Sequence, residues 1–348
     1  MRSKILLKFG KKFEDILNIK KNFYKDNDVL LKKQKTIAQL YKRQSVRQKC
    51  KACESKLRGQ KFINHNVEYI QCKICTHVNG RFNDTESFSK TIYESSNINY
   101  SKTYKSDNSK KFLARQKKIY NPKADFLKKY LKKKNKKIKI LDFGCGSGYF
   151  VSSLFDRGLR SVEGVELSKK QIDYGKNIFK KIGKNQNLLR YSDRKNIYKF
   201  LENTNANCIT LIGVLEHLVD IHMFLKCIKR NKNIKIIYLC VPMFSVSCLI
   251  ENSFPSIFNR HLGGGHTHLF TSESLKKLMK KFGFQEKAAW WFGTDMPDLY
   301  RSFCVNSEKN NSQALQNILN KFKLLIDDLQ LSVDKRKLSS QVHMIFKR

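Results

Sequence analysis

The chain has 348 residues, with 70 Lys and Arg against 29 Asp and Glu, which gives a formal net charge of +41. This length allows two or three modules, and 41% hydrophobic residues are enough to bury a core, which excludes a disordered tail protein. We find no run of about 18 apolar residues, and charge interrupts the first segment, so we expect neither a spanning helix nor a signal peptide and expect a cytoplasmic protein.

The positive charge has two interpretations. A cationic surface gains affinity for nucleic acid by releasing phosphate counterions, and it also attracts an anionic sugar carrier or a membrane surface. However, Lys is scattered over nearly every segment, whereas nucleic-acid-binding proteins concentrate their charge on one face or stripe. Composition therefore leaves nucleic acid open as a partner without favouring it.

The first predicted elements lie in a Lys-rich N-terminal segment, residues 1–47. Within it, Phe9, Phe13, Ile16 and Leu17 lie near helical spacing and predict one or two amphipathic helices. Such a basic helix suits peripheral contact with an anionic membrane, or it packs on the module that follows. The sequence does not choose between these two roles.

A cysteine block predicts a small metal-binding module over residues 48–80. The pattern C-x2-C-x18-C-x2-C is formed by Cys50, Cys53, Cys72 and Cys75. Two such tight turns present four thiolates, which satisfy the tetrahedral preference of Zn²⁺ and leave no open coordination position. The sequence therefore predicts a structural Zn²⁺, with His65 and His77 as alternative ligands.

The rest of the chain has the pattern of a doubly wound α/β domain. We expect a linker and a leading helix over 81–135, and a larger domain over 136–348 with a helical insertion at 293–338. Apolar runs alternate with helical segments along this domain, which predicts a mostly parallel sheet. The seven predicted strands are Ile138–Asp142, Ser161–Glu166, Asn187–Tyr191, Cys208–Ile212, Ile234–Val241, Phe284–Trp291 and Gln341–Phe346.

A glycine-rich turn follows the first of these strands and predicts a ligand site. Gly144, Gly146 and Gly148 alternate with other residues just before a predicted helix, so a ligand can approach the backbone there. A dinucleotide fingerprint would need a glycine where Tyr149 stands, and the Gly-Lys-Ser/Thr ending of a P-loop is absent from this turn.

Two acidic residues describe the ligand further. Asp142 ends the first strand, where its carboxylate attracts an ammonium group and repels a phosphate. Glu166 ends the next strand, where a carboxylate can accept hydrogen bonds from both hydroxyls of a ribose. The implied ligand has a ribose and a positively charged end, but no phosphate.

These residues lie in motifs that resemble a known family. The run LDFGCGSG, followed by VEGVELS, resembles the first two motifs of class I S-adenosylmethionine-dependent methyltransferases. The segments VLEHL and HTHLFTSESLKKLMKKFGF are similar to the "EH" and "H-x-x-x-F/L-T" segments of a large bacterial branch. Several members of that branch carry an N-terminal zinc knuckle and sit near sugar or polysaccharide biosynthesis. The resemblance covers residues 138–292 and the cysteine block, and it implies a Rossmann-like, seven-stranded sheet whose last strand is antiparallel.

The resemblance implies a set of residues that bind S-adenosylmethionine. Those expected along the methionine moiety are Asp142, Gly144, Gly146 and Gly148. Glu166 is expected at the ribose, and Gly213 is expected where the backbone approaches the cofactor. Asp193 matches the position that contacts the adenine amine, although an N-cap of the following helix explains it equally well.

Three histidines are candidate catalytic residues. His217 follows the fourth strand, where cofactor and substrate would meet, and it could take a proton from a hydroxyl. Its alternative is a structural one, in which Glu216 and His217 cap the next helix or bind the backbone. His266 and His268 follow a glycine-rich stretch that could close as a lid, and their alternation suits a base, a metal site or structural hydrogen bonding.

We therefore expect an S-adenosylmethionine-dependent methyltransferase whose acceptor is small or carrier-linked, a sugar or related metabolite methylated on oxygen or carbon. The N/D-P-P-Y/F loop of exocyclic-amine methylases is replaced here by residues 213–217, so that chemistry is disfavoured. The alternatives are an RNA methyltransferase with the zinc knuckle as a recognition module, and a non-catalytic cofactor-binding scaffold. The acceptor atom, the use of a general base and the oligomeric state do not follow from the sequence.

Overall fold

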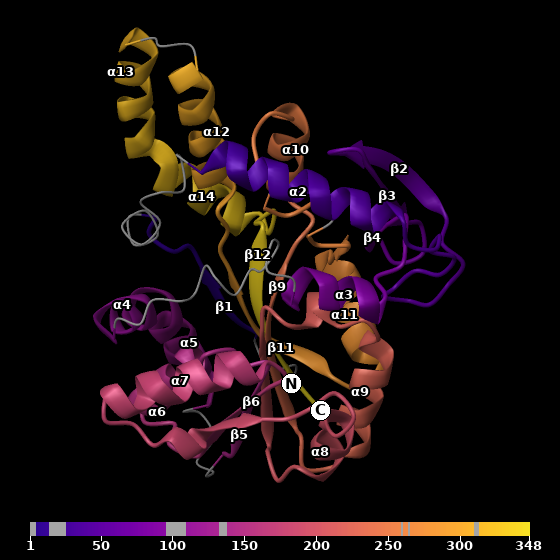
Figure 1. The fold of residues 1–348 in the computed structure, drawn as a ribbon, viewed down its shortest axis with the longest axis vertical. Helices are drawn as coiled ribbons and strands as arrows, with labels where there is room; N and C mark the ends of the chain where they lie inside the picture. Colours follow the sequence, from indigo (N-terminus) through magenta and orange to yellow (C-terminus); the bar gives the residue numbers. More distant parts are fainter. Residues whose placement is uncertain are drawn as a thin grey trace.

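The computed structural model contains an eight-stranded, mostly parallel sheet (Figure 1). The structure describes residues 5–13, 26–94, 109–131, 138–258, 260–263, 265–309 and 313–348. In spatial order the strands are β1 (Leu6–Phe9), β11 (Gln285–Trp291), β12 (Gln341–Lys347), β9 (Ile236–Pro242), β8 (Cys208–Ile212), β5 (Ile140–Phe143), β6 (Val162–Glu166) and β7 (Leu189–Tyr191). Only β12 runs antiparallel to its neighbours, so the predicted α/β class and the seven predicted strands are confirmed.

β1 is an eighth strand that the sequence analysis did not predict. Leu6–Phe9 pairs in parallel with Ala288–Trp291 at the edge of the sheet. The prediction of a helix from Phe9 onward is therefore wrong at its start, because pairing with β11 overrides the local helical spacing. Ile16 and Leu17 lie outside the described residues, whereas Phe13 is buried against the helical insertion.

Helices cover both faces of the large sheet. In β9 the side chain of Tyr238 packs toward one face and that of Leu239 toward the other, as strand alternation requires. The first face is covered by α4 (Ser109–Arg115), η2 (Gln116–Tyr120), α5 (Asn121–Leu131), α6 (Tyr149–Asp156) and α7 (Lys169–Lys181). The second is covered by α8 (Ile197–Asn203), α9 (Ile221–Arg230) and α11 (Ser272–Lys281). Short turns of helix, η3 (Gln186–Leu188) and η4 (Leu215–His217), precede β7 and follow β8.

A second, smaller sheet joins the cysteine module to the larger domain. Its antiparallel order is β10 (His268–Leu269), β4 (Val78–Gly80), β3 (Val67–Cys72) and β2 (Gly59–Asn64). Because β10 lies far from the module in the sequence and belongs to the larger domain, the module is not an independent folding unit. The sheet packs on α2 (Asn27–Lys42) and α3 (Glu86–Glu94), with Tyr41, Tyr69, Phe88 and Leu269 in the shared core.

The expected linker needs correction, whereas one of the predicted N-terminal helices is present. The segment expected as a linker from residue 81 contains α3, and its residues 95–108 lie outside the described part of the chain. One predicted N-terminal helix is present as α2, and it buries Ile37 and Tyr41 against the small sheet. This packing is the second of the two roles expected for the N-terminal segment.

Helices occupy the segment that was expected to be a helical insertion. It contains α12 (Asp295–Lys309), α13 (Gln313–Phe322), η5 (Lys323–Leu325) and α14 (Ile326–Lys335), next to α10 (Val246–Ser253). The fully buried Asp295 holds it in place by accepting hydrogen bonds from Ser247 Oγ at 2.7 Å, Ser340 N–H at 2.9 Å and Gln330 Nε2 at 3.2 Å. One carboxylate thus ties α10, α14 and the start of β12 together.

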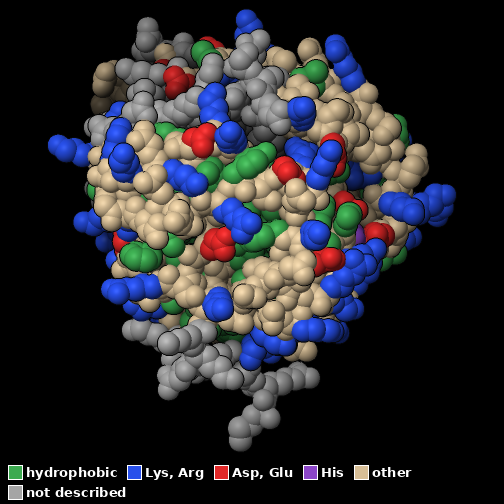
Figure 2. Space-filling model, turned by 60° about the horizontal axis from the view of Figure 1, so that its bottom comes forward, with side chains coloured by type: hydrophobic (Ala, Val, Ile, Leu, Met, Phe, Trp, Pro, Cys, Tyr) green, Lys and Arg blue, Asp and Glu red, His purple; other side chains and the backbone are tan. Residues whose placement is uncertain are grey.

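Surface charge and helix hydrophobicity are two further features of the described part of the chain. On the face shown in Figure 2, Lys and Arg side chains are dispersed, with Asp and Glu between them, and form no single stripe. None of the helices in the described ranges is both long and apolar enough to cross a membrane.

Gly80 offers a test of the contact between β4 and β10. A Cβ at this position would lie 2.7 Å from the Thr267 carbonyl oxygen and 2.3 Å from the Tyr41 hydroxyl oxygen. We expect Gly80→Ala to lower the free energy of unfolding by about 1–3 kcal/mol, because the backbone of one strand must move away from the other. Urea denaturation followed by circular dichroism measures this, and an unchanged midpoint would contradict the close approach.

Candidate functional site

The carboxyl ends of three adjacent strands form the candidate site. β5 lies between β6 and β8, so Asp142 near the end of β5, Glu166 at the end of β6 and Gly213 just after β8 come to the same edge of the sheet. Ligands of doubly wound folds bind at this edge. The sequence prediction of a shared site at these strand ends therefore matches the topology.

The glycine loop leaves open space for a ligand. Gly144, Gly146 and Gly148 have φ values of 71°, 53° and 81°, which L side chains rarely adopt. A Cβ on Gly144 or Gly148 would lie within 3 Å of a neighbouring side chain, whereas a Cβ on Gly146 would meet no heavy atom within 4 Å. The loop is thus packed on its inner side and open at Gly146.

Glu166 organises this loop through its carboxylate. Oε2 accepts a hydrogen bond from the Gly146 N–H at 2.9 Å, and Oε1 accepts one from the Ser168 N–H at 2.9 Å. Each carboxylate oxygen has a second lone pair, so both can still accept from a diol. The half-buried Glu166 therefore fits the predicted ribose contact and also fixes the open glycine of the loop.

Asp142 is a buried acid beside the loop. It is 2% exposed and accepts a hydrogen bond from Thr210 Oγ1 at 2.6 Å. Burial raises the pKa of Asp142 to about 7, although the Thr210 hydrogen bond opposes this shift. A cationic group placed here would favour the charged carboxylate, which agrees with an ammonium-bearing ligand.

The two remaining predicted cofactor contacts differ in their surroundings. Asp193 is exposed after β7 and accepts hydrogen bonds from the Asn196 N–H at 2.8 Å and from Asn196 Nδ2 at 3.0 Å. Asp193 thus closes a turn just before α8, whose N-cap is Asn196, so the predicted alternative of Asp193 as the N-cap is wrong. The adenine contact stays a prediction. Gly213 follows β8 with φ 73°, and a Cβ there would lie 3.7 Å from Glu216 Oε1.

Three polar side chains gather next to Gly213. The rings of His217 and His266 stack with centroids 5.2 Å apart, and Glu216 Oε1 lies 3.8 Å from His217 Nε2. One ligand-capable atom from each residue lies within 4.8 Å of the others. The structure therefore brings together two predicted histidines and adds Glu216, which the sequence analysis treated only as a capping partner.

Burial controls the charge of this cluster. It lowers the pKa of His217 to about 3 and that of His266 to about 4, and it raises the pKa of Glu216 to about 8. Both imidazoles are therefore neutral near pH 7 and carry a nitrogen lone pair. The N-cap of α9 is Asp220, whose carboxylate accepts a hydrogen bond from the Met223 N–H at 2.8 Å. The alternative prediction that Glu216 and His217 cap this helix is therefore wrong.

His268 contacts different partners from His266. It lies in β10 opposite Asn79, and its ring centroid is 4.9 Å from that of His77 and 5.3 Å from that of Phe270. It is completely buried between the cysteine module and α11. These contacts suit a packing role, and a catalytic role for His268 stays a prediction.

The four predicted cysteine ligands come together. Cys50 Sγ lies 3.6 Å from Cys75 Sγ, and Cys53 Sγ lies 3.7 Å from Cys72 Sγ, with all four thiols free. A tetrahedron with metal–sulfur bonds of about 2.3 Å has edges of about 3.8 Å, so the spacing fits one Zn²⁺. His77 instead hydrogen-bonds Ser274 Oγ through Nδ1 at 3.3 Å, and neither His77 nor His65 belongs to the cluster.

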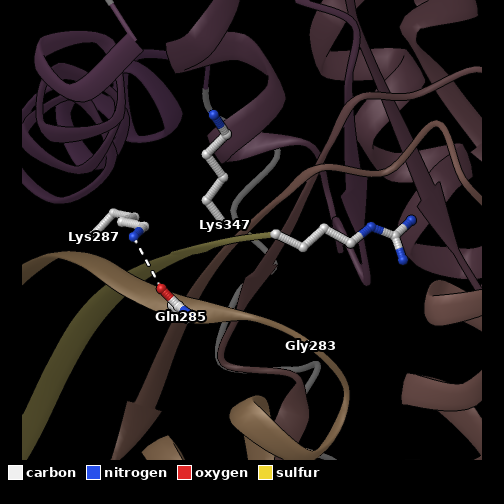
Figure 3. A pocket seen from close by; sticks show the side chains of 5 residues that line it. Gly283, Gln285, Lys287 and Lys347 are labelled. Carbon is white, nitrogen blue, oxygen red and sulfur yellow. Dashed lines mark hydrogen bonds between the residues drawn. The ribbon is translucent and has the colours of Figure 1, made fainter. Parts of the chain in front are cut away.

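A surface pocket of about 300 Å³ lies away from this site (Figure 3). Its lining residues are Gly283, Gln285, Lys287, Lys347 and Arg348. Gln285 begins β11, so the pocket is at the amino end of the parallel strands, opposite the edge that carries Asp142 and Glu166. It is therefore separate from the candidate site.

Comparisons with known proteins give a family match in sequence and distant likenesses in structure. Residues 115–287 match the family model described as a methyltransferase domain, and no curated protein matches the chain in sequence. A methyltransferase domain of bacterial CtHen1 has 17% identity and a TM-score of 0.44, and the match covers 68% of this chain and 100% of that chain. Magnesium protoporphyrin IX methyltransferase from Synechocystis PCC 6803 with bound SAH has 12% identity and a TM-score of 0.45, and the match covers 61% of this chain and 94% of that chain. Geranyl diphosphate C-methyltransferase from Streptomyces coelicolor A3(2) has 16% identity and a TM-score of 0.39, and the match covers 70% of this chain and 85% of that chain.

The matched residues include the glycine loop, both strand-end carboxylates and the cluster around His217. These are the groups that the fold places at the ligand-binding edge of the sheet. Because the match to the family and the geometry of the site fall on the same residues, the chain is an S-adenosylmethionine-dependent methyltransferase.

Proposed function

We propose that the enzyme methylates a hydroxyl group of a small or carrier-linked acceptor, such as a sugar or a related metabolite. The observation that carries this proposal is the half-buried, neutral His217–His266 pair next to Gly213 at the cofactor edge. Methylation of a hydroxyl releases a proton, and a neutral imidazole is a suitable acceptor for it. A carbon acceptor, the other predicted chemistry, would lose its proton to the same pair.

The binding residues follow from the fit of the loop. S-adenosylmethionine, when bound, supplies a methyl group on a sulfonium centre that is open to attack. Asp142 would hold the ammonium end, Glu166 would accept from the ribose hydroxyls, and Gly146 leaves the space that the ligand needs. Their main contribution is to hold the reactants in line, which can supply several orders of magnitude in rate.

The proton transfer involves the histidine pair. The acceptor oxygen forms a bond to the methyl carbon as the carbon–sulfur bond breaks, and the hydroxyl proton passes to an imidazole nitrogen. The products are a methyl ether, S-adenosylhomocysteine and a protonated imidazole, which later returns its proton to solvent. Glu216, with Oε1 3.8 Å from His217 Nε2, would stabilise the imidazolium when ionised.

RNA is the competing acceptor, and two observations favour the smaller one. The basic side chains on the face in Figure 2 are dispersed and do not follow a stripe. Strand β4 of the cysteine module pairs with β10. In addition, the hydroxyl oxygens of Thr76 in the module and Thr271 in the methyltransferase domain lie 2.6 Å apart. These contacts support a scaffolding role for the module.

We also propose that Cys50, Cys53, Cys72 and Cys75 bind one structural Zn²⁺. Closed tetrahedral thiolate sites of this kind stabilise folding and do not activate substrates. Asn79 connects the cluster to the rest of the fold: its Nδ2 donates to Cys50 Sγ at 3.4 Å, and its Oδ1 accepts from the Lys51 N–H at 2.9 Å. The cluster therefore fixes the strand that pairs with β10.

The first prediction tests the reaction. His217→Ala should keep the affinity for S-adenosylmethionine within about threefold, but lower methyl transfer by about 10²–10⁴-fold, because the proton acceptor is lost. Incorporation of labelled methyl from S-adenosylmethionine, assayed against nucleotide sugars, carrier-linked glycans and RNA, measures this. Label that enters only RNA, with a steep dependence on salt, would contradict the small-acceptor proposal.

The second prediction concerns pH. The pKa of Asp142 is raised to about 7, so its carboxylate is mostly protonated below that pH and ionises as the pH rises. An ammonium-bearing ligand binds the ionised form, so affinity for S-adenosylmethionine should rise by about tenfold between pH 5.5 and 7.5. Calorimetric titration measures this, and Asp142→Asn should bind more weakly with a flat profile. The same slope in the variant would contradict the role of Asp142.

The third prediction concerns the zinc cluster. Cys72→Ser should remove about one Zn²⁺ per chain and speed hydrogen exchange of the β10 amides by about tenfold or more, since β4 loses its support. Metal analysis and exchange mass spectrometry measure these changes. Cys304→Ser, at a lone half-buried cysteine, is the matched control. Unchanged zinc content in Cys72→Ser would rule out the proposed ligand set.

A further inference from the structure

We propose that Glu216, His217 and His266 bind a divalent transition-metal ion, separate from the cysteine cluster, at the cofactor edge of the sheet. The proposed acceptor chemistry would use this ion, but the ion site itself stands on the geometry of the three side chains. They come from two distant parts of the chain, η4 and the segment that leads into β10. Their donor atoms nevertheless lie within 4.8 Å of one another.

The spacing of the donors is close to that of a coordinated ion. Bonds of about 2.0–2.2 Å to nitrogen and oxygen place neighbouring ligand atoms about 3.0–3.5 Å apart. Glu216 Oε1 and His217 Nε2 are 3.8 Å apart, so small side-chain rotations close the set around an ion. Two imidazoles and one carboxylate are the donors of open sites for Zn²⁺ and other first-row divalent metals.

The carboxylate provides an independent sign of a missing cation. The Glu216 side chain is 4% exposed, and within the described residues its buried Oε2 has no hydrogen-bond partner. A buried acid without a partner is costly, because it loses hydration without replacement. A cation bound between Glu216 and the two imidazoles would satisfy this oxygen.

The surroundings of His266 orient it as a ligand. Its Nδ1–H donates to the carbonyl oxygen of His261 at 3.1 Å, which leaves the lone pair on Nε2. The His261 backbone is held in turn, because its N–H donates to Glu251 Oε1 at 2.8 Å. A metal-bound histidine typically has this arrangement, with its second nitrogen bonded to a carbonyl that fixes the ring.

The ion would define the acceptor more closely. Three protein donors leave coordination positions open, and the cluster borders Gly213, so an acceptor oxygen on the ion would lie beside the cofactor loop. An ion of this kind lowers the pKa of a bound hydroxyl, so the metal-bound form would release the hydroxyl proton to solvent, whereas the metal-free form passes it to the histidine pair. His217→Ala impairs both forms, because His217 is a metal ligand in one and a proton acceptor in the other. This chemistry selects an acceptor with a hydroxyl next to a second oxygen donor, such as a vicinal diol.

Metal titration of the full-length protein tests the site. With the cysteine cluster first loaded with Zn²⁺, wild-type protein should bind one further Mn²⁺ or Zn²⁺ per chain, followed by electron paramagnetic resonance of free Mn²⁺ and by metal analysis. Glu216→Gln and His266→Ala should each weaken this binding by about tenfold or more, because each removes one of three ligands. His222→Gln, at a buried histidine outside the cluster, is the matched control and should bind as wild type does.

The outcomes separate the metal site from the proposed function. Absence of a second ion in wild-type protein, or unchanged binding in both variants, would overturn the site. Circular dichroism and the zinc content of the cysteine cluster show whether each variant is folded. Calorimetric binding of S-adenosylmethionine to the same samples is read independently: retained cofactor binding without a second ion rejects only the metal, and absent cofactor binding rejects only the proposed function.

Discussion

The pairing of β4 with β10 is the contact on which the candidate site depends. It is short, with the Gly80 N–H donating to the Thr267 carbonyl oxygen at 2.7 Å and His268 opposite Asn79. Yet it joins parts of the chain that are almost two hundred residues apart. The segment that it holds carries His266, and the ring of this residue reaches His217 at the end of β8. Together with the hydrogen bond from His266 Nδ1 to the His261 carbonyl oxygen, this pairing fixes one histidine against the other.

Burial produces the chemistry at both halves of the site. Asp142 and Glu216 are each almost fully buried, and burial raises the pKa of both carboxyl groups well above their ordinary values. Desolvation of the half-buried His217 and His266 lowers the pKa of both imidazoles and keeps them neutral. The cofactor edge therefore presents acids that favour a cation and imidazoles that offer lone pairs. A sulfonium cofactor with an ammonium end and a bound divalent ion are two cations that such an edge can stabilise.

Local pattern predicted most of the fold, and long-range pairing explains what it did not. The seven predicted strands are apolar runs between helices, and the cysteine spacing lies within 26 residues, so both signals are local. β1 escaped prediction because Leu6–Phe9 includes a lysine and becomes a strand only by pairing with β11. Glu216 was placed correctly beside His217 but given a capping role, since only the fold shows that Asp220 caps α9. Burial of a strand-end acid was the signal that the sequence could not supply.

The position of the cysteine module argues for scaffolding as its role. Its two cysteine turns contact helices of the methyltransferase domain. Lys277 Nζ of α11 donates a hydrogen bond to the Ile74 carbonyl oxygen at 3.2 Å, and His222 Nε2 of α9 forms a hydrogen bond with the Lys51 carbonyl oxygen at 3.2 Å. Such contacts on two helices of the methyltransferase domain leave the module rigid with respect to the site. A recognition module would need a free face for its ligand, whereas a scaffold needs the attachment seen here. The energy of the proposed metal binding would then hold the segment that leads into β10, and so keep His266 against His217 before an acceptor binds.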